Sequence, residues 1–166
     1  RAYIAKHPSQ HPSIRWAGRH LAGFLATEAP YRDEPWLTDM ARSVWAPAFA
    51  FDAEDAPAAG LADLVGVPPE FWGSIRLAFH PTLDAFRIAT PVDEARPRLL
   101  EDPATQLDRA ARCGRAIMAW RIEHDVKFRA IDALEFSALQ AMRDGATFGD
   151  LCELVAGGVD PVTAPL

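Results

Sequence analysis

Histidines are the side chains of this sequence with the clearest potential to hold a metal ion. His7 and His11 lie four residues apart, the spacing at which one face of a helix presents two ligands to a metal. Pro8 and Pro12 disfavour a continuous helix through this pair, so the spacing gives only weak support for a metal site. The remaining histidines have no cysteine or carboxylate at a recognised ligand spacing; they are His20, His80 and His124.

Two other groups of side chains could also do chemistry. The acidic cluster of Asp52, Glu54 and Asp55 could in principle hold a hard cation such as Ca²⁺. No loop of calcium-binding spacing surrounds the cluster, so acids of a solvated loop are the better interpretation. The cysteines Cys113 and Cys152 lie far apart without a CxxC partner, and we interpret both as reduced packing residues.

The common catalytic signatures are missing from the sequence. It contains no Gly-rich phosphate loop, nucleophile elbow, HExxH motif or dinucleotide fingerprint. We therefore predict that the protein is not an enzyme, has no catalytic or metal-binding residues and uses no cofactor of its own. An active site assembled from scattered residues is the alternative to this prediction.

Composition and charge narrow the classes of protein further. Of the 166 residues, 49% are hydrophobic and 24% are charged, which is typical of a globular protein. The net charge of −6 argues against non-specific attraction to nucleic acid, because that requires an excess of Lys and Arg. No run of about 18 apolar residues occurs and the first residues lack a signal-peptide pattern, so we predict a cytoplasmic protein without a membrane partner.

The first half of the chain carries the periodicity of amphipathic helices. Ser13 can cap a helix that runs to about Ala26, with apolar residues at helical spacing. A second helical stripe spans residues 36–48, with Pro47 near its end, and its aromatic side chains are expected in the core rather than in a cofactor site. Short helices are expected at 61–64 and 68–72, and residues 75–79 form either a short strand or an extended segment.

The pattern changes after Thr90. Between Thr90 and Pro103 lie three prolines and several charges without clear periodicity, which predicts a linker or a surface-wrapping loop. We therefore expect a helical domain at residues 1–92, a linker at 93–112 and a second module at 113–166.

This second module is predicted to combine a hairpin with two capped helices. Two strand-like runs, 116–121 and 126–129, flank a polar turn at 122–125. Asp132, with Glu135 three residues on, can cap a helix that ends near Gly145, and Thr147 can cap the next helix. A hairpin followed by two helices supplies the parts of a winged-helix module. The expected fold class is therefore mainly α, with a helical N-terminal domain followed by a small winged-helix-like α+β module.

Short motifs occur along the chain in a characteristic order. They are Tyr3-Ile4-Ala5-x-His7-Pro8, Leu37-x-x-Met40-Ala41-Arg42-x-x-Trp45, Phe79-His80-Pro81 and Trp120-Arg121. A tail from Ala133 to Cys152 follows them. With these motifs the chain resembles the HvfC/BufC-type N-terminal domain family over nearly its whole length.

The resemblance implies both a fold and a function. Proteins of this family have an all-helical N-terminal domain and a winged-helix-like domain, and they are commonly labelled DNA-binding. The family also has more helix before the position of Ala2 and an apolar segment after that of Pro165, so both modules of this chain are expected to be truncated. Family members are partners of multinuclear non-heme iron-dependent oxidases that modify cysteines in ribosomally made peptides. They recognise the precursor peptide, and the iron belongs to the partner enzyme.

DNA binding is the first of two readings of the winged-helix-like module. A winged helix places its second helix in the major groove, and here that helix would span Phe148 to Ala156. Its exposed charges would be Asp150 and Glu153, where DNA-binding proteins place Arg or Lys. From Cys113 onward five basic residues face eight acidic ones, which makes a DNA-binding transcription regulator the less favoured alternative.

Peptide recognition is the second reading, and we prefer it. An extended peptide can add a strand to the hairpin edge without any basic surface. Arg121, Lys127 and Arg129 could contact an acidic leader peptide, while Trp120 and Phe128 are either apolar anchors or core residues. We therefore expect a non-catalytic protein that binds a Cys-containing precursor peptide and presents it to an iron oxidase. A purely structural scaffold remains a third hypothesis.

Overall fold

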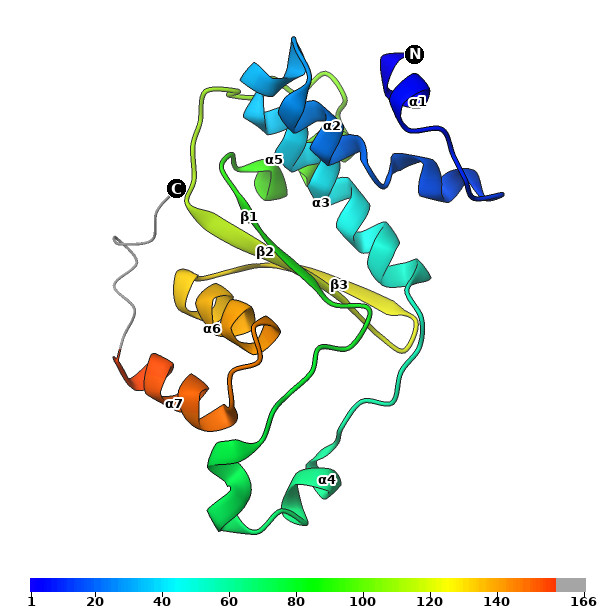
Figure 1. The fold of residues 1–166 in the computed structure, drawn as a ribbon. Coiled ribbons are helices and arrows are strands. Elements are labelled where there is room, and N and C mark those ends of the chain that lie inside the picture. The colour runs from blue at the N-terminus through cyan, green and yellow to red at the C-terminus, as the bar shows by residue number, and fades with distance from the viewer. Residues whose placement is uncertain (158–166) are drawn as a thin grey trace.

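The computed structural model describes residues 1–157, which form an α+β fold around one small antiparallel sheet (Figure 1). The sheet has three strands, β1 (Asp84–Ile88), β2 (Arg115–Ile122) and β3 (Asp125–Ile131), in the order β1-β2-β3. About half of the residues are helical, and helices lie on both faces of the sheet. The part of the predicted module at 158–166 lies outside the described residues.

Side chains alternate between the two faces of the sheet along each strand, and both faces carry apolar residues. Phe86 pairs with Ile117, and Ala119 pairs with Phe128, so these side chains share one face. That face packs against helix α3 (Pro35–Asp52) and helix α5 (Val92–Glu101). The opposite face packs against helix α6 (Ala133–Arg143), and its core residues are Ala85, Ala116, Met118, Ile131 and Phe136. Two thin cores therefore enclose the sheet.

Helix α3 continues through Pro47 to Asp52, four residues beyond the predicted stripe. An internal proline normally costs a helix one hydrogen bond and a steric clash with the preceding turn. Here Asp39, Ser43, Ala46 and Ala50 are buried at helical spacing, so the whole length of the helix packs on the sheet. This packing outweighs the local cost of the proline.

The helix predicted from Ser13 to Ala26 is divided in two. A 3₁₀ helix spans Ile14–Gly18 and α2 spans Leu21–Thr27. The expected cap is confirmed, since Ser13 Oγ accepts a hydrogen bond from Arg15 N at 3.3 Å. Tyr3, from the short helix α1 (Ala2–Lys6), explains the break. Its hydroxyl donates to the carbonyl of Ala17 and accepts from His20 N, two groups that a continuous helix would pair internally.

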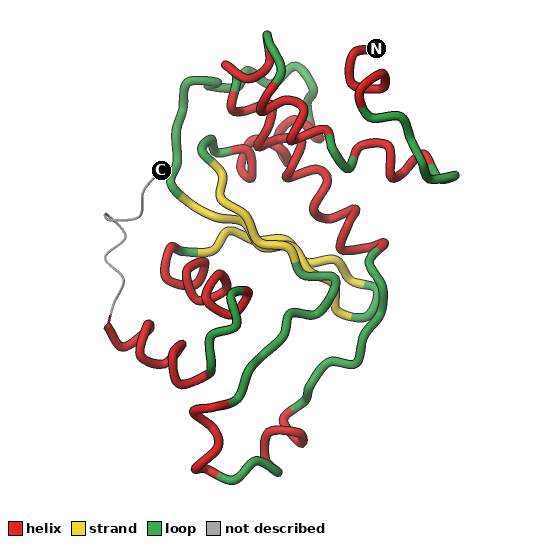
Figure 2. Tube along the Cα trace, in the orientation of Figure 1, coloured by secondary structure: helices red, strands yellow, loops and turns green. Residues whose placement is uncertain are grey.

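Residues 53–83 form an excursion that leaves the sheet and returns to it. It contains α4 (Leu61–Val65) and a 3₁₀ turn at Pro69–Ser74, reached by two long loops (Figure 2). Residues 75–79 are extended rather than a strand, with one isolated bridge between Arg76 and Thr147. At the tip, Phe148 N donates to the carbonyl of Ile75 at 2.8 Å. The excursion therefore contacts helix α7 (Phe148–Gly157).

The segment predicted as a linker or surface-wrapping loop, 93–112, is not a loop in its first half, because α5 occupies Val92–Glu101. Asp93 and Glu94 in its first turn and Arg98 in its last complement the helix dipole, and Val92 is buried in the core. In addition, β1 precedes the predicted boundary but pairs with β2, which follows it. One sheet therefore contains residues from both predicted domains, and the domain division itself stays a prediction.

The hairpin and the two helices that follow it are confirmed as secondary structure. The strands of the hairpin are joined at Glu123 and His124, within the predicted turn. Asp132 accepts a hydrogen bond from Glu135 N at 2.7 Å, and Thr147 Oγ1 accepts one from Asp150 N at 3.2 Å. Local signals of capping and turn formation were therefore sufficient to locate these elements. Within residues 1–157, no helix is both long and apolar enough to cross a membrane.

Asp39 links helix α3 to the end of β1 by hydrogen bonds. Its side chain is only 8% exposed, and Oδ2 accepts hydrogen bonds from Ala89 N, Thr90 N and Thr90 Oγ1 at 2.9, 2.9 and 2.8 Å. These donors lie just before α5, where the chain leaves the sheet. The carboxylate thus satisfies two backbone N–H groups that no described strand or helix pairs, one of them on the buried residue Thr90.

We expect Asp39→Ala to lower the free energy of unfolding by about 3 kcal/mol, because buried donors would lose their acceptor. Urea unfolding measures the change. Asp39→Asn, which keeps one acceptor oxygen, should lose less, and Asp33→Ala on an exposed 3₁₀ turn should have little effect. A loss no larger for Asp39→Ala than for Asp33→Ala would contradict this role.

Candidate functional site

The structure divides the five predicted peptide-binding residues between the two faces of the sheet. Trp120 is paired with Lys127, and Met118 with Arg129, so Trp120, Lys127 and Arg129 share the face that carries α6. Arg121 and Phe128 point to the α3 side. Three of the five therefore lie together, and we define the hairpin face as Trp120, Ile122, Lys127 and Arg129.

Ile122 belongs to this hairpin face and was missed from the sequence. Its side chain is 55% exposed, and by strand alternation it lies on the same side as Met118 and Trp120. Trp120 is partly buried and packs against the α6-side core. The apolar surface therefore runs from the core outward to the hairpin turn. The alternation of Met118, Trp120 and Ile122 was the signal that could have found it.

Both cations of the hairpin face already have acidic partners. Lys127 Nζ lies 3.1 Å from Asp125 Oδ2, and Arg129 Nη1 donates to Glu135 Oε2 at 2.9 Å. The hydrogen bond with Glu135 raises the pKa of Arg129 above its ordinary value. An acidic ligand must therefore compete with these carboxylates, so charge alone does not favour its binding here.

Beside the hairpin face, strand β3 has an outer edge that is unpaired within residues 1–157. The strand order places β3 at an edge of the sheet, and within the described part of the chain only β2 pairs with it. Lys127, Arg129 and Ala130 are exposed along it. An exposed edge offers unpaired backbone donors and acceptors to another extended chain. The chemistry available here is strand addition beside an apolar surface.

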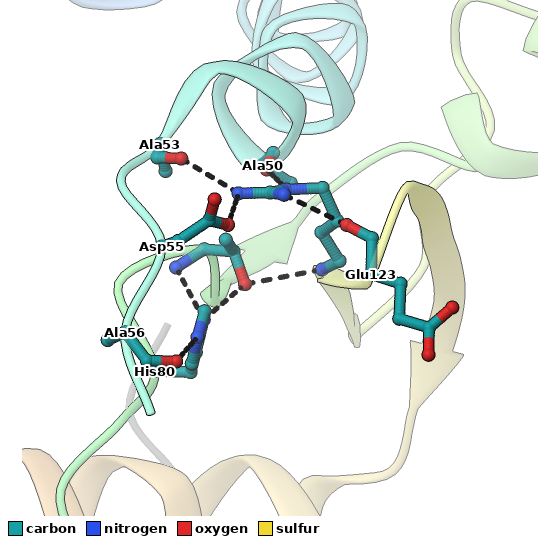
Figure 3. A network of polar contacts seen from close by, with 8 residues as sticks. Ala50, Ala53, Asp55, Ala56, His80 and Glu123 are labelled. Carbon is teal, nitrogen blue, oxygen red and sulfur yellow. Dashed lines mark hydrogen bonds and ion pairs between the residues drawn. The ribbon is translucent and has the colours of Figure 1, made fainter. Parts of the chain in front are cut away.

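Arg121 has a different task from its neighbour Trp120. Its side chain is 9% exposed and lies against the C-terminal end of α3. Figure 3 labels four of its partners, Ala50, Ala53, Asp55 and Glu123. The guanidinium donates to the carbonyls of Ala50, Ala53 and Glu123 at 3.0, 2.9 and 2.9 Å, and lies 2.9 Å from Asp55 Oδ1. The planar group thus joins the helix, the hairpin turn and the start of the excursion.

The same network continues to the other end of the excursion. Arg121 N donates to Thr82 Oγ1 at 3.3 Å, and that hydroxyl lies 2.9 Å from His80 Nδ1. Because Thr82 N also donates to His80 Nδ1, the ring proton is on Nε2, which donates to the Ala56 carbonyl at 2.9 Å. His80 and Arg121 therefore close the base of the excursion. Figure 3 shows His80 beside Ala56.

Phe128 also lies on the α3 side, where it packs partly buried against the cluster of Ile117 and Ala119. It is held in the core beneath α3, away from the hairpin face. In this structure a ligand on the hairpin face would contact Trp120 but not Phe128.

Helix α7, the element that would read DNA, presents acidic rather than basic side chains. Asp150 and Glu153 are exposed, together with Cys152 and Val155. Asp150 Oδ2 accepts hydrogen bonds from Thr147 N at 2.7 Å and Thr147 Oγ1 at 2.8 Å, and the backbone bond lowers the pKa of Asp150 most. Its charge therefore serves to cap the helix.

No metal centre competes with these sites among the described residues. Within residues 1–157, no group of three or more His, Cys, Asp or Glu side chains is arranged to hold a metal ion. Cys113 is partly buried beside the Ile88 carbonyl, and Cys152 is exposed on α7. The hairpin face is thus the strongest candidate site that the sequence analysis pointed to.

We expect Arg121→Lys to destabilise the protein by about 2 to 4 kcal/mol, because a single ammonium cannot donate to three separated carbonyls. Arg129→Ala, which removes a surface ion pair, should cost less than about 1 kcal/mol. Urea unfolding of both variants checks the difference. Limited proteolysis should also show faster cleavage of residues 53–83 in Arg121→Lys. Equal stability of the two variants would show that Arg121 does not hold the fold.

The capping role of Asp150 predicts a pH dependence. The pKa of Asp150 lies below its ordinary value of 3.8. The ionised carboxylate therefore stabilises α7 at pH values above 3.8, and this contribution is lost as the pH falls through the lowered pKa. Amide hydrogen exchange in the first turn of α7 should therefore lose protection progressively in the wild type as the pH falls below about 4 and through the lowered pKa of Asp150. Asp150→Asn should lack this step and Glu153→Gln should keep it; a step of equal size in all three proteins would argue against the cap.

Comparison with known proteins identifies no relative of this chain. No protein-family model, no curated protein and no solved structure matches it.

Proposed function

We propose that this protein is a non-catalytic partner that binds a Cys-containing, ribosomally made precursor peptide and presents it to an iron-dependent, peptide-modifying oxidase. The observation that carries the proposal is the exposed outer edge of β3 next to the hairpin face. The iron belongs to the partner enzyme, and this chain contributes the binding surface for the peptide.

The peptide binds by strand addition along β3. Backbone hydrogen bonds to the strand edge supply affinity, and alternate side chains of the peptide fall on the same side as Trp120 and Ile122. Lys127 and Arg129 lie on the strand that receives the peptide, so acidic peptide side chains can replace Asp125 or Glu135 as their partners. The apolar contacts anchor the peptide, and the exchange of ion-pair partners adds selectivity.

The helical side of the molecule supports the role of a partner protein. A groove of about 500 Å³ lies between α2 and α3, and apolar side chains dominate its lining, among them Leu21, Leu25, Leu37 and Val44. Val44 is 51% exposed. Exposed apolar surfaces of this kind commonly mark contacts between proteins. The enzyme would then contact α3 while the peptide occupies the opposite side of the sheet.

The winged-helix interpretation is part of the same proposal. The hairpin and the two helices that follow it supply the elements it requires, with the hairpin rather than the second helix as the binding element. DNA recognition by α7 has no specific observation in its favour, because the exposed charges of that helix are Asp150 and Glu153. The regulator of transcription therefore remains the weaker alternative.

Strand addition can be tested with backbone-methylated peptides. The probe is a synthetic peptide from the short Cys-containing reading frame expected beside the gene, titrated by calorimetry. Alternate amides of an added strand point toward the receiving edge, so N-methylation of one alternating set should abolish binding and methylation of the other set should not. Equal effects of the two sets would exclude strand addition. The absence of an oxidase gene and of such a reading frame would count against the whole proposal.

Ile122→Ser tests the hairpin face without touching the core. We expect it to weaken peptide binding about tenfold, since roughly 1.4 kcal/mol of apolar contact would be lost. Val65→Ser is the matched control, because Val65 is an exposed aliphatic residue of α4, distant in sequence from the hairpin. Binding that falls equally in both variants, or in neither, would show that the peptide does not use this face.

A further inference from the structure

The N-terminal segment has a charge opposite to that of the rest of the chain. Residues 1–27 contain four Lys or Arg side chains and no Asp or Glu, in a protein with a net charge of −6. They also contain three of the five histidines. A concentration of cationic and imidazole groups in one segment of an acidic protein attracts negatively charged ligands.

The segment lines a small polar cavity that is open to solvent. The cavity has a volume of about 200 Å³ and lies between α1 and the residues just before α2. Its lysine, arginine and histidine side chains are Lys6, His7, His11, Arg19 and His20, and its lining contains no carboxylate. This volume fits a small ligand.

Internal hydrogen bonds fix the protonated nitrogen of two histidine rings. Arg19 Nε donates to His20 Nε2 at 2.9 Å, and Ser13 N donates to His11 Nδ1 at 3.1 Å. A neutral imidazole carries its proton on the nitrogen that does not accept. His20 therefore carries an N–H at Nδ1 and His11 at Nε2. Neither N–H has an acceptor among residues 1–157, so both remain available as donors.

These hydrogen bonds favour an anion over a metal cation. A metal needs a ring nitrogen with a free lone pair, but the lone pairs of His11 and His20 already accept hydrogen bonds. The rings of His7 and His20 are stacked, with centroids 5.1 Å apart, rather than pointing at a common centre. What the cavity offers is a set of N–H donors beside the positive charge of Arg19.

We propose that this cavity binds a phosphate group, carried by inorganic phosphate or by a small phosphate monoester. The ionised oxygens of a phosphate group accept hydrogen bonds, and they can meet donors arriving from several directions. Arg19 supplies the charge, because its remaining guanidinium N–H groups have no acceptor among the described residues. Lys6 contributes less, since its Nζ lies 2.5 Å from Glu28 Oε1.

The test is a titration of the whole chain with inorganic phosphate and, separately, with glycerol phosphate, followed by the ring nitrogen signals of its histidines in NMR spectra. We expect saturable shifts of His20 and His11 with a dissociation constant of about 1 mM or below, and little shift of His124 on the hairpin turn. The tighter of the two ligands identifies the source of the phosphate group. Saturation by neither ligand, or equal shifts of His124, would overturn the proposal.

Arg19→Gln provides the matched test by mutation. It should weaken phosphate binding at least about tenfold, because a charge-assisted hydrogen bond is lost. Arg32→Gln, at an exposed arginine outside the cavity, should bind as the wild type does. A thermal unfolding midpoint of Arg19→Gln close to that of the wild type without phosphate shows that the fold is intact. If both variants bind phosphate equally, or if binding falls only together with the fold, the cavity is not the site.

Discussion

Two buried charged side chains hold helix α3 to the sheet, and the remaining structure depends on this attachment. Asp39 binds the backbone at the end of β1, and Arg121 binds the carbonyls at the end of α3. The two charges bond mainly to backbone groups rather than to each other, so each satisfies donors or acceptors that regular secondary structure leaves free. An 18-residue helix is thereby fixed toward both of its ends.

The excursion and α7 follow from this attachment. The base of the excursion is closed by Arg121 and His80, while its tip meets the first turn of α7. The fit at the tip is close, since a Cβ added to Gly149 would lie 2.9 Å from the Gly73 carbonyl oxygen. Only a residue without a side chain allows this approach. Long-range contacts therefore position α7 even though its own first turn is capped locally by Thr147.

The sequence was sufficient for features whose signals are local. The hairpin and the cap at Asp132 were predicted because the residues that form them lie within a few positions of each other. Helix α5 was missed because Pro91 and Pro97 resemble linker residues, and β1 was missed because its partner strand begins 27 positions after its end. The role of Arg121 depends on carbonyl acceptors of α3, which no side-chain pattern reveals. Ile122 was within reach of the sequence, since alternation with Trp120 places it on the hairpin face.

The adjacent residues Trp120 and Arg121 lie in different surroundings although they are neighbours on one strand. Successive side chains of a strand point to opposite faces, so the arginine bonds to the end of α3 while the tryptophan lies on the α6 side of the sheet. A variant that changes both Trp120 and Arg121 would therefore alter the hairpin face and the stability of the fold at the same time. The cationic cavity near Arg19 is built from a different segment, at the N-terminal end of the chain. Recognition of a peptide and of a phosphate group would thus use different surfaces, and neither ligand would need to displace the other.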